Sequence, residues 1–472
     1  MSSFRSRAPP PPPPTLRPPA HSSQPNTRTP TSASTPLPPA PPPRPSTGSR
    51  PPRPPPPPQT RSALTLRIRN YHPLPRPPSA PDPGAHHQTS LDFSDAGWHL
   101  ASTSSARELQ LYDVRTGACV LTVKCQKFGC DLACFAMGAY GLPAPGTVSG
   151  SGPTGERGKA SAPAQAPGPG SGLSVLHTST LGEPIVRHLD LAHGGQYVNY
   201  YSGHTRPVRT LVRFPKEDLF LSASRDSVHL WDLRQRVHTV RMRFEGKAFL
   251  RGAVDPSGLV FALGDAADGV LGLWDRRFAH RKPFAVWDVK ERVQGGGMHW
   301  GTEEGGAGWS RVEFGNDGRL LLVAGEGDRA SVLLDAAGGE LLGSLALPKG
   351  VVLREKAGRR STGDYGDAKS KALGEPPTSS GSITFAPDGR HLIGGSGSKD
   401  IYVWDTASIQ PPDGSQTPDS GVQAHRPLEP VKRLEGSQSA GAVVTFNPRL
   451  HAFATADREV MIWSPESETA VP

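Results

Sequence analysis

One unit recurs seven times along the chain, and this repetition restricts the possible fold more than any other feature of the sequence. Each unit has an apolar strand, a turn with Asp-Gly or Pro, a second strand, a polar turn, and a third strand that ends near Trp-Asp or Tyr-Asp. The clearest copy begins at Gly203-His204 and ends at Trp231-Asp232. The copies span residues 91–113, 129–190, 203–232, 247–275, 309–335, 382–405 and 442–463. Because so small a unit cannot bury its apolar faces alone, we expect the copies to pack side by side.

The third copy also predicts a buried polar relay. Once the Trp231 side chain is buried, its indole N–H needs a hydrogen-bond acceptor. Ser222 or Ser224, together with His204 and Asp226, can complete a chain of satisfied donors and acceptors. A Gly-His dipeptide upstream of Trp-Asp is typical of WD40 repeats. The chain therefore resembles that family, and the predicted fold is all-β, a seven-bladed WD40 β-propeller.

The ends of the chain complete this architecture. The last copy has only three strands, which would leave an open sheet edge. The alternating segment ALTLRIR, within residues 62–70, is expected to supply the fourth strand and close the ring. The propeller would then span residues 62–466, after a disordered Pro/Arg-rich tail at 1–61 and before a short tail at 467–472. Polar, Gly-rich inserts are expected to form surface loops near residues 141–172, 294–308, 355–380 and 409–430.

The net charge of +9 comes from the N-terminal region. Residues 1–81 contain eleven Arg, no Lys and no acidic residue, so residues 82–472 carry 41 basic and 43 acidic groups, a net −2. We therefore expect no direct sequence-specific binding of nucleic acid, and interpret the tail as a soluble extension, a nonspecific polyanion-binding arm or a ligand of SH3 or WW modules. No apolar run approaches the roughly eighteen residues of a membrane span and no signal-peptide pattern occurs, which predicts an intracellular protein outside the membrane.

The sequence contains no catalytic constellation. Aspartates recur at one position of the repeat, which indicates an architectural role, since catalysis needs one special set of groups. Cys119, Cys125, Cys130 and Cys134 have no C-x-x-C spacing, so core packing is favoured over the alternative, a zinc site. We expect no cofactor and no metal, and interpret the ring as a platform for protein partners.

Several stretches resemble the Swd-two-type WD-repeat subunit that is shared by COMPASS, the SET-domain histone H3 lysine-4 methyltransferase complex, and by cleavage and polyadenylation factor. The segment ELQLYDVRTGACVLTVKCQKFGCDL, residues 108–132, is similar to the family's passage from the first to the second blade. Residues 200–234, YYSGHTRPVRTLVRFPKEDLFLSASRDSVHLWDLR, resemble its third blade. Phe446-Asn447-Pro448 and the terminal Trp463-Ser464-Pro465 are similar to its closing segment.

The resemblance implies a noncatalytic scaffold in the nucleus. Its expected partners are the SET-domain methyltransferase, other COMPASS subunits, cleavage/polyadenylation and termination factors, and the phosphorylated tail of RNA polymerase II. Candidate contact residues are Arg206, Arg209, Arg225, Arg234 and Arg277. Their guanidinium groups suit acidic or phosphorylated peptides, although each residue is alternatively a solvated loop cation.

A different function is also compatible with the pattern. Trp231-Asp232-Leu233-Arg234 and Trp274-Asp275-Arg276-Arg277 fit the W-D-x-R pattern that adaptor proteins recognise in substrate receptors of cullin-type ubiquitin ligases. The alternative hypothesis is therefore a WD40 substrate receptor.

Overall fold

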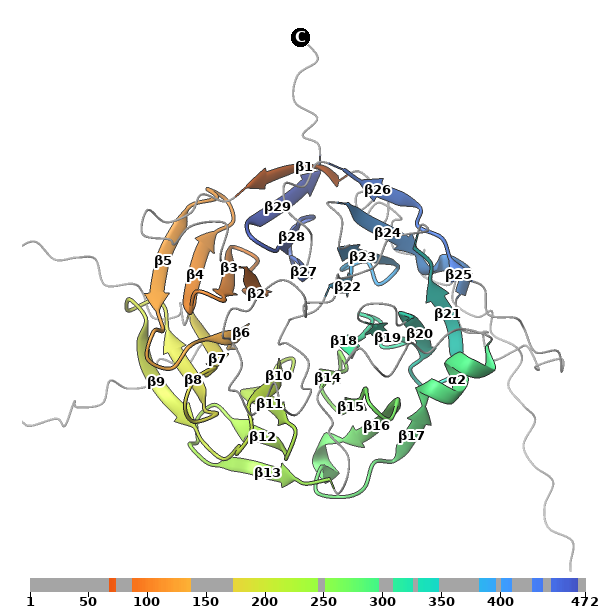
Figure 1. Cartoon of the computed structure of the whole chain (residues 1–472), viewed down its shortest axis with the longest axis horizontal. Coiled ribbons are helices and arrows are strands. Elements are labelled where there is room, and N and C mark those ends of the chain that lie inside the picture. The colour runs from red at the N-terminus through yellow and green to blue at the C-terminus, as the bar shows by residue number, and fades with distance from the viewer. Residues whose placement is uncertain are drawn as a thin grey trace, which may run out of the picture. The chain divides into compact units, whose positions relative to one another are not determined.

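In the computed structural model, seven β-sheets stand side by side around a central axis, and the residues that the structure describes form a ring (Figure 1). This arrangement confirms the predicted all-β, seven-bladed propeller. The structure describes residues 68–73, 87–136, 173–244, 251–296, 309–325, 330–347, 382–395, 400–409, 427–435 and 443–465. The predicted tails at 1–61 and 467–472 and the predicted inserts near 141–172 and 355–380 lie outside these residues.

We number the sheets as blades 1 to 7 in the chain order of their inner strands. The strands of each blade are given below from the ring centre to the rim. Blade 1 contains β2 (Gln88–Phe93), β3 (His99–Ser104), β4 (Glu108–Asp113) and β5 (Cys119–Lys124). Blade 2 contains β6 (Asp131–Phe135), β7 (Ser174–Thr178), β8 (Val186–Asp190) and β9 (Gln196–Tyr201). Blade 3 contains β10 (Val208–Arg213), β11 (Leu219–Ser224), β12 (Val228–Asp232) and β13 (His238–Met242).

The remaining blades follow the same plan. Blade 4 contains β14 (Arg251–Val254), β15 (Val260–Asp265), β16 (Val270–Asp275) and β17 (Ala285–Asp288). Blade 5 contains β18 (Trp309–Phe314), β19 (Leu320–Gly325), β20 (Val332–Asp335) and β21 (Leu341–Leu345). Blade 6 contains β22 (Ile383–Phe385), β23 (His391–Gly395), β24 (Ile401–Asp405) and β26 (Lys432–Leu434). Blade 7 contains β27 (Val443–Phe446), β28 (Phe453–Ala456), β29 (Val460–Pro465) and β1 (Ile68–Pro73).

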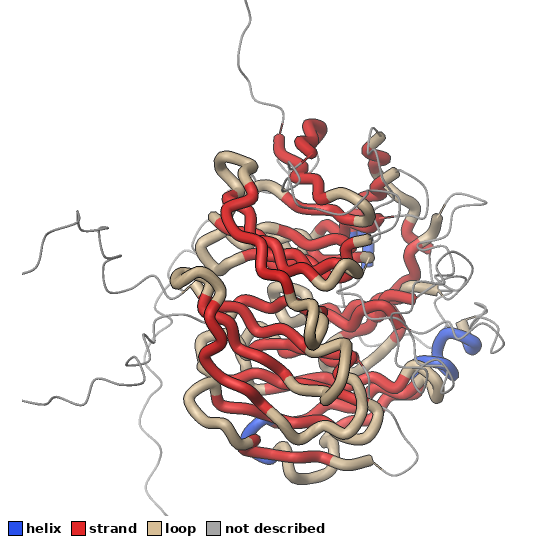
Figure 2. The backbone as a smooth tube through the Cα atoms, turned by 60° about the vertical axis from the view of Figure 1, so that its left-hand side comes forward, coloured by secondary structure: helices blue, strands red, loops and turns tan. Residues whose placement is uncertain are grey.

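Helical turns are short and lie between strands, as the tube in Figure 2 shows. They are η1 (Arg276–Phe278), α2 (Val289–Gly295) and η3 (Thr406–Ile409). Within the described residues, no helix is long and apolar enough to cross a membrane.

The first strand of the chain completes the last blade. β1 pairs antiparallel with β29, with Tyr71 opposite Trp463 and Pro73 opposite Met461. The described part of the strand is Ile68–Pro73, which shares residues 68–70 with the predicted closing segment 62–70, and residues 62–67 lie outside the described residues. The pairing is made by backbone groups, which need no alternation of apolar side chains.

The core of the ring lies between the blades. The described residues form seven apolar clusters, and each cluster takes its members from two neighbouring sheets. One of them joins blade 7 to blade 1, with Ile462 and Ala454 packed against Leu91 and Leu100. A buried apolar contact at every blade junction, including this last one, explains why a closed ring is preferred over an open row of sheets.

Two predicted surface loops contain regular structure. The region near 409–430 was expected to be a loop, but Pro427–Leu428 forms β25, which pairs in parallel with β21 and widens blade 5 to five strands. The region near 294–308 begins inside α2, whose Val289 and Val293 are buried against blades 4 and 5. An open sheet edge offers unpaired backbone groups, and this is why a two-residue segment can add to it.

Cys130 and Cys134 are close in the sequence but lie in different surroundings. A bulge between Asp131 and Cys134 interrupts the strand, and Leu132 has a φ of 52°. Cys130 therefore packs between blades 1 and 2, whereas Leu132 and Cys134 line the central cavity.

Candidate functional site

Blade 3 brings the five predicted relay residues together. The Trp231 indole Nε1 donates to the Ser222 hydroxyl at 2.8 Å, and this hydroxyl lies 2.6 Å from His204 Nε2. His204 Nδ1 lies 2.7 Å from the Ser224 hydroxyl, which in turn donates to an Asp226 carboxylate oxygen at 2.5 Å. The relay thus runs from the third strand through the second strand and the segment before the first strand, and fixes all three in one unit.

The protonation of this relay follows from its two ends. The indole can only donate and the carboxylate can only accept, so every hydroxyl between them donates toward Asp226. His204 then accepts at Nε2 and donates at Nδ1, which requires the neutral ring. Burial lowers the pKa of His204 to about 4, against the opposing effect of Asp226. The neutral relay therefore persists at physiological pH.

A second histidine lies directly against the relay. The ring of His229 stacks on that of His204 with centroids 4.2 Å apart and planes at 12°. Both nitrogens of His229 are buried without a hydrogen-bond partner among the described residues. A Cβ added at Gly203 would lie 2.8 Å from the His229 ring, so this close approach requires the glycine of the Gly-His dipeptide.

Burial disfavours the charged form of several histidines in blades 2 and 3. It lowers the pKa of His177 and His188 to about 4 and that of His229 to about 3. Together with His204, four histidines are held neutral inside the ring. This set creates a dependence of stability on pH.

Tryptophans in other blades use different acceptors. Trp463 donates to the Thr455 hydroxyl at 2.9 Å, and Trp404 donates to the Ala346 carbonyl at 2.9 Å. In blade 1, Ser102 occupies the strand position that Ser222 occupies in blade 3, and its buried hydroxyl has no partner among the described residues.

The five predicted contact arginines do not form one site. We call the end of each blade with the turn between its second and third strands the top face, and the other end the bottom face. Arg206 and Arg225 lie at the top of blade 3, on either side of the relay. Arg209 lies on the inner strand β10 and lines the central cavity. Arg234 and Arg277 lie at the bottom, in the turns after β12 and β16.

The two bottom arginines hold the turns in which they lie. Arg234 donates from Nε and Nη2 to the Asp232 carboxylate at 2.9 and 2.7 Å, and Arg277 binds Asp275 in the same way at 3.0 and 2.6 Å. These bidentate bonds hold the pKa of both aspartates below the ordinary value. The W-D-x-R pattern is thus explained by a local loop structure, with one edge of each guanidinium already occupied.

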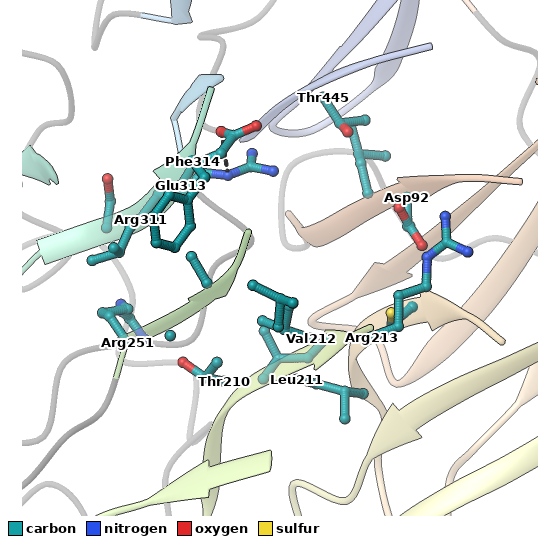
Figure 3. A pocket seen from close by; sticks show the side chains of 18 of the residues that line it. Asp92, Thr210, Leu211, Val212, Arg213, Arg251, Arg311, Glu313, Phe314 and Thr445 are labelled. Atoms are coloured by element: carbon teal, nitrogen blue, oxygen red, sulfur yellow. Dashed lines mark ion pairs between the residues drawn. The ribbon is translucent and has the colours of Figure 1, made fainter. Parts of the chain in front are cut away.

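The central cavity, of about 510 Å³, is a feature that the sequence analysis missed. Arg209, Arg213, Arg251 and Arg311 line it together with Asp92 and Glu313. Figure 3 shows Arg213 beside Asp92 on one side and Arg311 beside Glu313 on the other. The sequence signal was an arginine within an otherwise apolar inner strand, as in TLVRF, LRGAV and SRVEF.

The cavity arginines connect blades that are not neighbours in the ring. Arg213 of blade 3 donates to Asp95 of blade 1 at 2.7 Å, past blade 2, and Arg311 of blade 5 donates to the Val444 carbonyl of blade 7 at 3.1 Å, past blade 6. Arg251 donates to the carbonyls of Trp309 at 2.6 Å and Arg209 at 2.9 Å, and so joins blades 3, 4 and 5. The arginines of the cavity therefore act primarily as cross-links between blades.

The carboxyl groups in the cavity are perturbed by burial. Burial raises the pKa of Asp92 to about 6, although the charge of Arg213 and a hydrogen bond from the Phe135 backbone N–H at 2.7 Å act in the opposite direction. Burial likewise raises the pKa of Glu313, which accepts a hydrogen bond from Thr384 and pairs with Arg311. Four arginines face two carboxyl groups in this cavity, so its lining carries a net positive charge at neutral pH.

Among the residues that the structure describes, no group of three His, Cys, Asp or Glu side chains is placed so that it could hold a metal ion. The four cysteines are free thiols, and three of them are buried.

Comparison with known proteins identifies the repeat. The family model for the WD domain, G-beta repeat, matches residues 195–232 and 378–405, which contain the first three strands of blades 3 and 6, respectively. The chain is 26% identical over 381 residues to WD repeat-containing protein 82 of Drosophila melanogaster, which covers 80% of this chain and 90% of that protein.

Two further relatives carry the name of a complex. COMPASS component SWD2 of Saccharomyces cerevisiae is 26% identical over 379 residues, 79% of this chain and 89% of its own length. Set1 complex component swd2 of Schizosaccharomyces pombe is 22% identical over 400 residues, 80% of this chain and 92% of its own length. With the ring, the relay and these relatives in agreement, the chain is a WD40-repeat protein homologous to the SWD2 proteins and to WD repeat-containing protein 82.

Proposed function

We propose that this chain is a noncatalytic scaffold subunit of a COMPASS-type histone H3 lysine-4 methyltransferase complex and acts in the nucleus. The observation that carries the proposal is the extent of the homology. Two relatives named as components of COMPASS or of the Set1 complex match this chain over 89% and 92% of their own length, and over 79% and 80% of this chain. The WD40 ring supplies a rigid body with exposed turns on both faces, as a scaffold requires.

The finer parts of the proposal concern the partners. The scaffold would bind the SET-domain methyltransferase and other COMPASS subunits, and would also serve cleavage/polyadenylation and termination factors and the phosphorylated tail of RNA polymerase II. The resemblance of blade 3 to the Swd-two-type subunit supports this extension, and it is tested separately from membership of the methyltransferase complex.

We assign the partner contacts first to the top face of blade 3. Arg206 and Arg225 flank the relay, which holds the segment before β10 rigidly against the turn after β11. Two arginines on backbone segments that are held in place suit an acidic or phosphorylated peptide. The bottom residues Arg234 and Arg277 bind their own aspartates through one guanidinium edge, so we rank them second as partner contacts.

Purification of the tagged protein from nuclear extract tests the assignment. We expect a SET-domain methyltransferase to copurify with the full chain, and with a chain that lacks residues 1–61. Depletion of the protein is expected to reduce histone H3 lysine-4 methylation. Unchanged methylation after depletion, or cullin adaptors in place of the methyltransferase, would contradict the scaffold and favour the alternative substrate receptor.

Charge reversal then separates the two faces. Arg206→Glu with Arg225→Glu is expected to release the partner, whereas Arg234→Glu with Arg277→Glu serves as the matched pair on the opposite face of the ring. Loss of the partner from the second variant alone would move the contact to the bottom face.

A further inference from the structure

The turn between β16 and β17 of blade 4 exposes apolar and cationic side chains together. Residues 276–284, RRFAHRKPF, contain four Arg or Lys and no acidic residue. Phe278 is 44% exposed, Phe284 is 62% exposed, and Val286 on the adjoining strand is 59% exposed. Large exposed apolar side chains that cluster among cations on a rigid surface are typical of an interaction site.

The turn is held in place, so the exposure of its aromatic rings is a stable property. Asp275 caps η1 by accepting from the Arg277 backbone N–H, and its carboxylate also binds the Arg277 guanidinium. Arg276 pairs with Glu217 of blade 3, and Ala279 is buried beneath the turn. The surface is therefore preorganised for a partner, which reduces the conformational entropy lost on binding.

Cations are already positioned over one of the rings. The guanidinium of Arg281 lies 4.8 Å from the Phe278 ring centroid and that of Arg277 lies 5.7 Å from it. Arg281 and Lys282 are exposed, and neither has an acidic partner among the residues that the structure describes. An acidic side chain that binds Arg281 would at the same time bury the cation–π pair from water and strengthen it.

Blade 3 extends this surface. The Arg276–Glu217 ion pair places the bottom turns of blades 3 and 4 side by side. The neighbouring turn after β12 exposes Arg236 and Val237, the latter by 65%. The combined surface is cationic, with apolar side chains between the charges.

We propose that the blade-4 turn, residues 276–284, is a docking site for an acidic peptide segment that carries aromatic or aliphatic side chains. The acidic groups pair with Arg281 and Lys282, and the apolar groups pack on Phe278, Phe284 and Val286. A membrane surface is a poorer occupant, because inserting Phe278 would draw two guanidinium groups toward the hydrocarbon. The site is on the face opposite to Arg206 and Arg225, and it stands independently of the proposed complex.

Fluorescence anisotropy with the purified full chain tests the proposal. The probe is a short fluorescein-labelled peptide of repeating Asp-Glu-Phe, compared with peptides in which Ser replaces Phe or Lys replaces the acidic residues. We expect binding of the first probe alone. Phe278→Ser with Phe284→Ser, and separately Arg281→Glu with Lys282→Glu, are each expected to weaken binding by at least about tenfold, a change in affinity that the assay resolves clearly.

Blade 1 offers a matched control. Trp98 is 43% exposed and the Arg115 guanidinium lies 5.4 Å from its ring, so Trp98→Ser with Arg115→Glu removes a similar pair without touching the blade-4 turn. This variant is expected to bind the probe as the unaltered protein does. Melting temperatures of all variants are compared to show that the ring is intact.

Four outcomes would overturn the proposal. They are no binding of the Asp-Glu-Phe probe, equal binding of the Ser-containing probe, equal loss in the blade-1 control, and unchanged binding in both blade-4 variants. Vesicles of phosphatidylcholine and phosphatidylserine form a separate arm. Binding to vesicles without binding to the peptide would replace the proposed partner by an anionic membrane.

Discussion

Ser222 is the position at which the relay of blade 3 can be tested most sharply. Its buried hydroxyl accepts from the Trp231 indole at 2.8 Å and lies 2.6 Å from His204 Nε2, to which it donates. Ser222→Ala removes both bonds and leaves the indole N–H and the imidazole nitrogen buried without partners. We therefore expect a large loss of stability from the removal of a single oxygen atom.

The magnitude follows from the cost of unpaired buried groups. A buried donor or acceptor that loses its partner costs about 1–3 kcal/mol, so the two groups together predict a loss of about 2–6 kcal/mol in the free energy of unfolding. Ser102 provides the matched control, because it occupies the equivalent strand position in blade 1 and its hydroxyl has no partner among the described residues. Ser102→Ala breaks no hydrogen bond and is expected to leave stability unchanged or slightly raised.

Equilibrium urea unfolding measures the difference. Tryptophan fluorescence and far-ultraviolet circular dichroism are recorded together, and coincident transitions establish a two-state comparison. In a Trp231→Phe background, the cost of Ser222→Ala is expected to fall, because there is no indole N–H to leave unpaired. Equal unfolding free energies for Ser222→Ala and Ser102→Ala would refute the relay as a source of stability.

Three further predictions follow from other parts of the ring. His177, His188, His204 and His229 have pKa values of about 3 to 4 in the folded chain against 6.5 unfolded. As the pH falls, the unfolded chain therefore takes up protons on these histidines before the folded chain does. The free energy of unfolding is expected to be highest above pH 6.5 and to fall toward pH 4. Asp92 offsets part of this loss, because its pKa is raised in the folded chain, and melting temperatures measured across this pH range test the slope. Gly339→Ala is expected to lower the free energy of unfolding by more than about 2 kcal/mol, because the added Cβ would overlap the Trp287 indole between blades 4 and 5 at a backbone φ of 71°. Urea unfolding measures this loss. Gly182→Ala is the control, since its φ of 70° is nearly the same but the space around it is open. Tyr71→Pro removes a backbone N–H from β1 and is expected to lower the melting temperature, with an unchanged value contradicting the role of β1 in ring closure.

The number of blades and the composition of the relay could be predicted because both leave a strong pattern in the sequence. The inner three strands of the blades are largely apolar, and in four of the seven blades the third strand ends at Trp-Asp or Tyr-Asp. The relay residues lie at fixed positions relative to these strands. The outer strands carry no such pattern. β5 and β13 are only partly buried, so the sequence does not need to alternate there.

The existence of β25 was not predicted, whereas the pairing of β1 was expected only because the last blade lacked a fourth strand. Both strands join a sheet edge through backbone hydrogen bonds, which any residue with an N–H can make. The parallel pairing of β25 with β21 also links segments far apart in the chain. Local sequence patterns contain little information about such contacts.

The division of the five predicted arginines among the top face, the cavity and the bottom face could not be seen from residue type. A guanidinium suits an acidic partner in any of these places, whether that partner is another protein or an aspartate two residues away. Asp232 and Asp275 show that the nearest acceptor was internal. The cavity arginines were overlooked because each sits alone in an apolar strand and meets its acceptor only when the ring is closed.

The pairing of β1 with β29 also affects how the protein is made. Roughly 390 residues separate the two strands, so at a synthesis rate of about 5–20 residues per second β1 emerges from the ribosome roughly 20–80 s before its partner exists. For that interval the nascent chain holds a strand whose final neighbour has not been translated. Chaperones that shield such a strand from other polypeptides would therefore determine how much of the newly made protein reaches the closed ring.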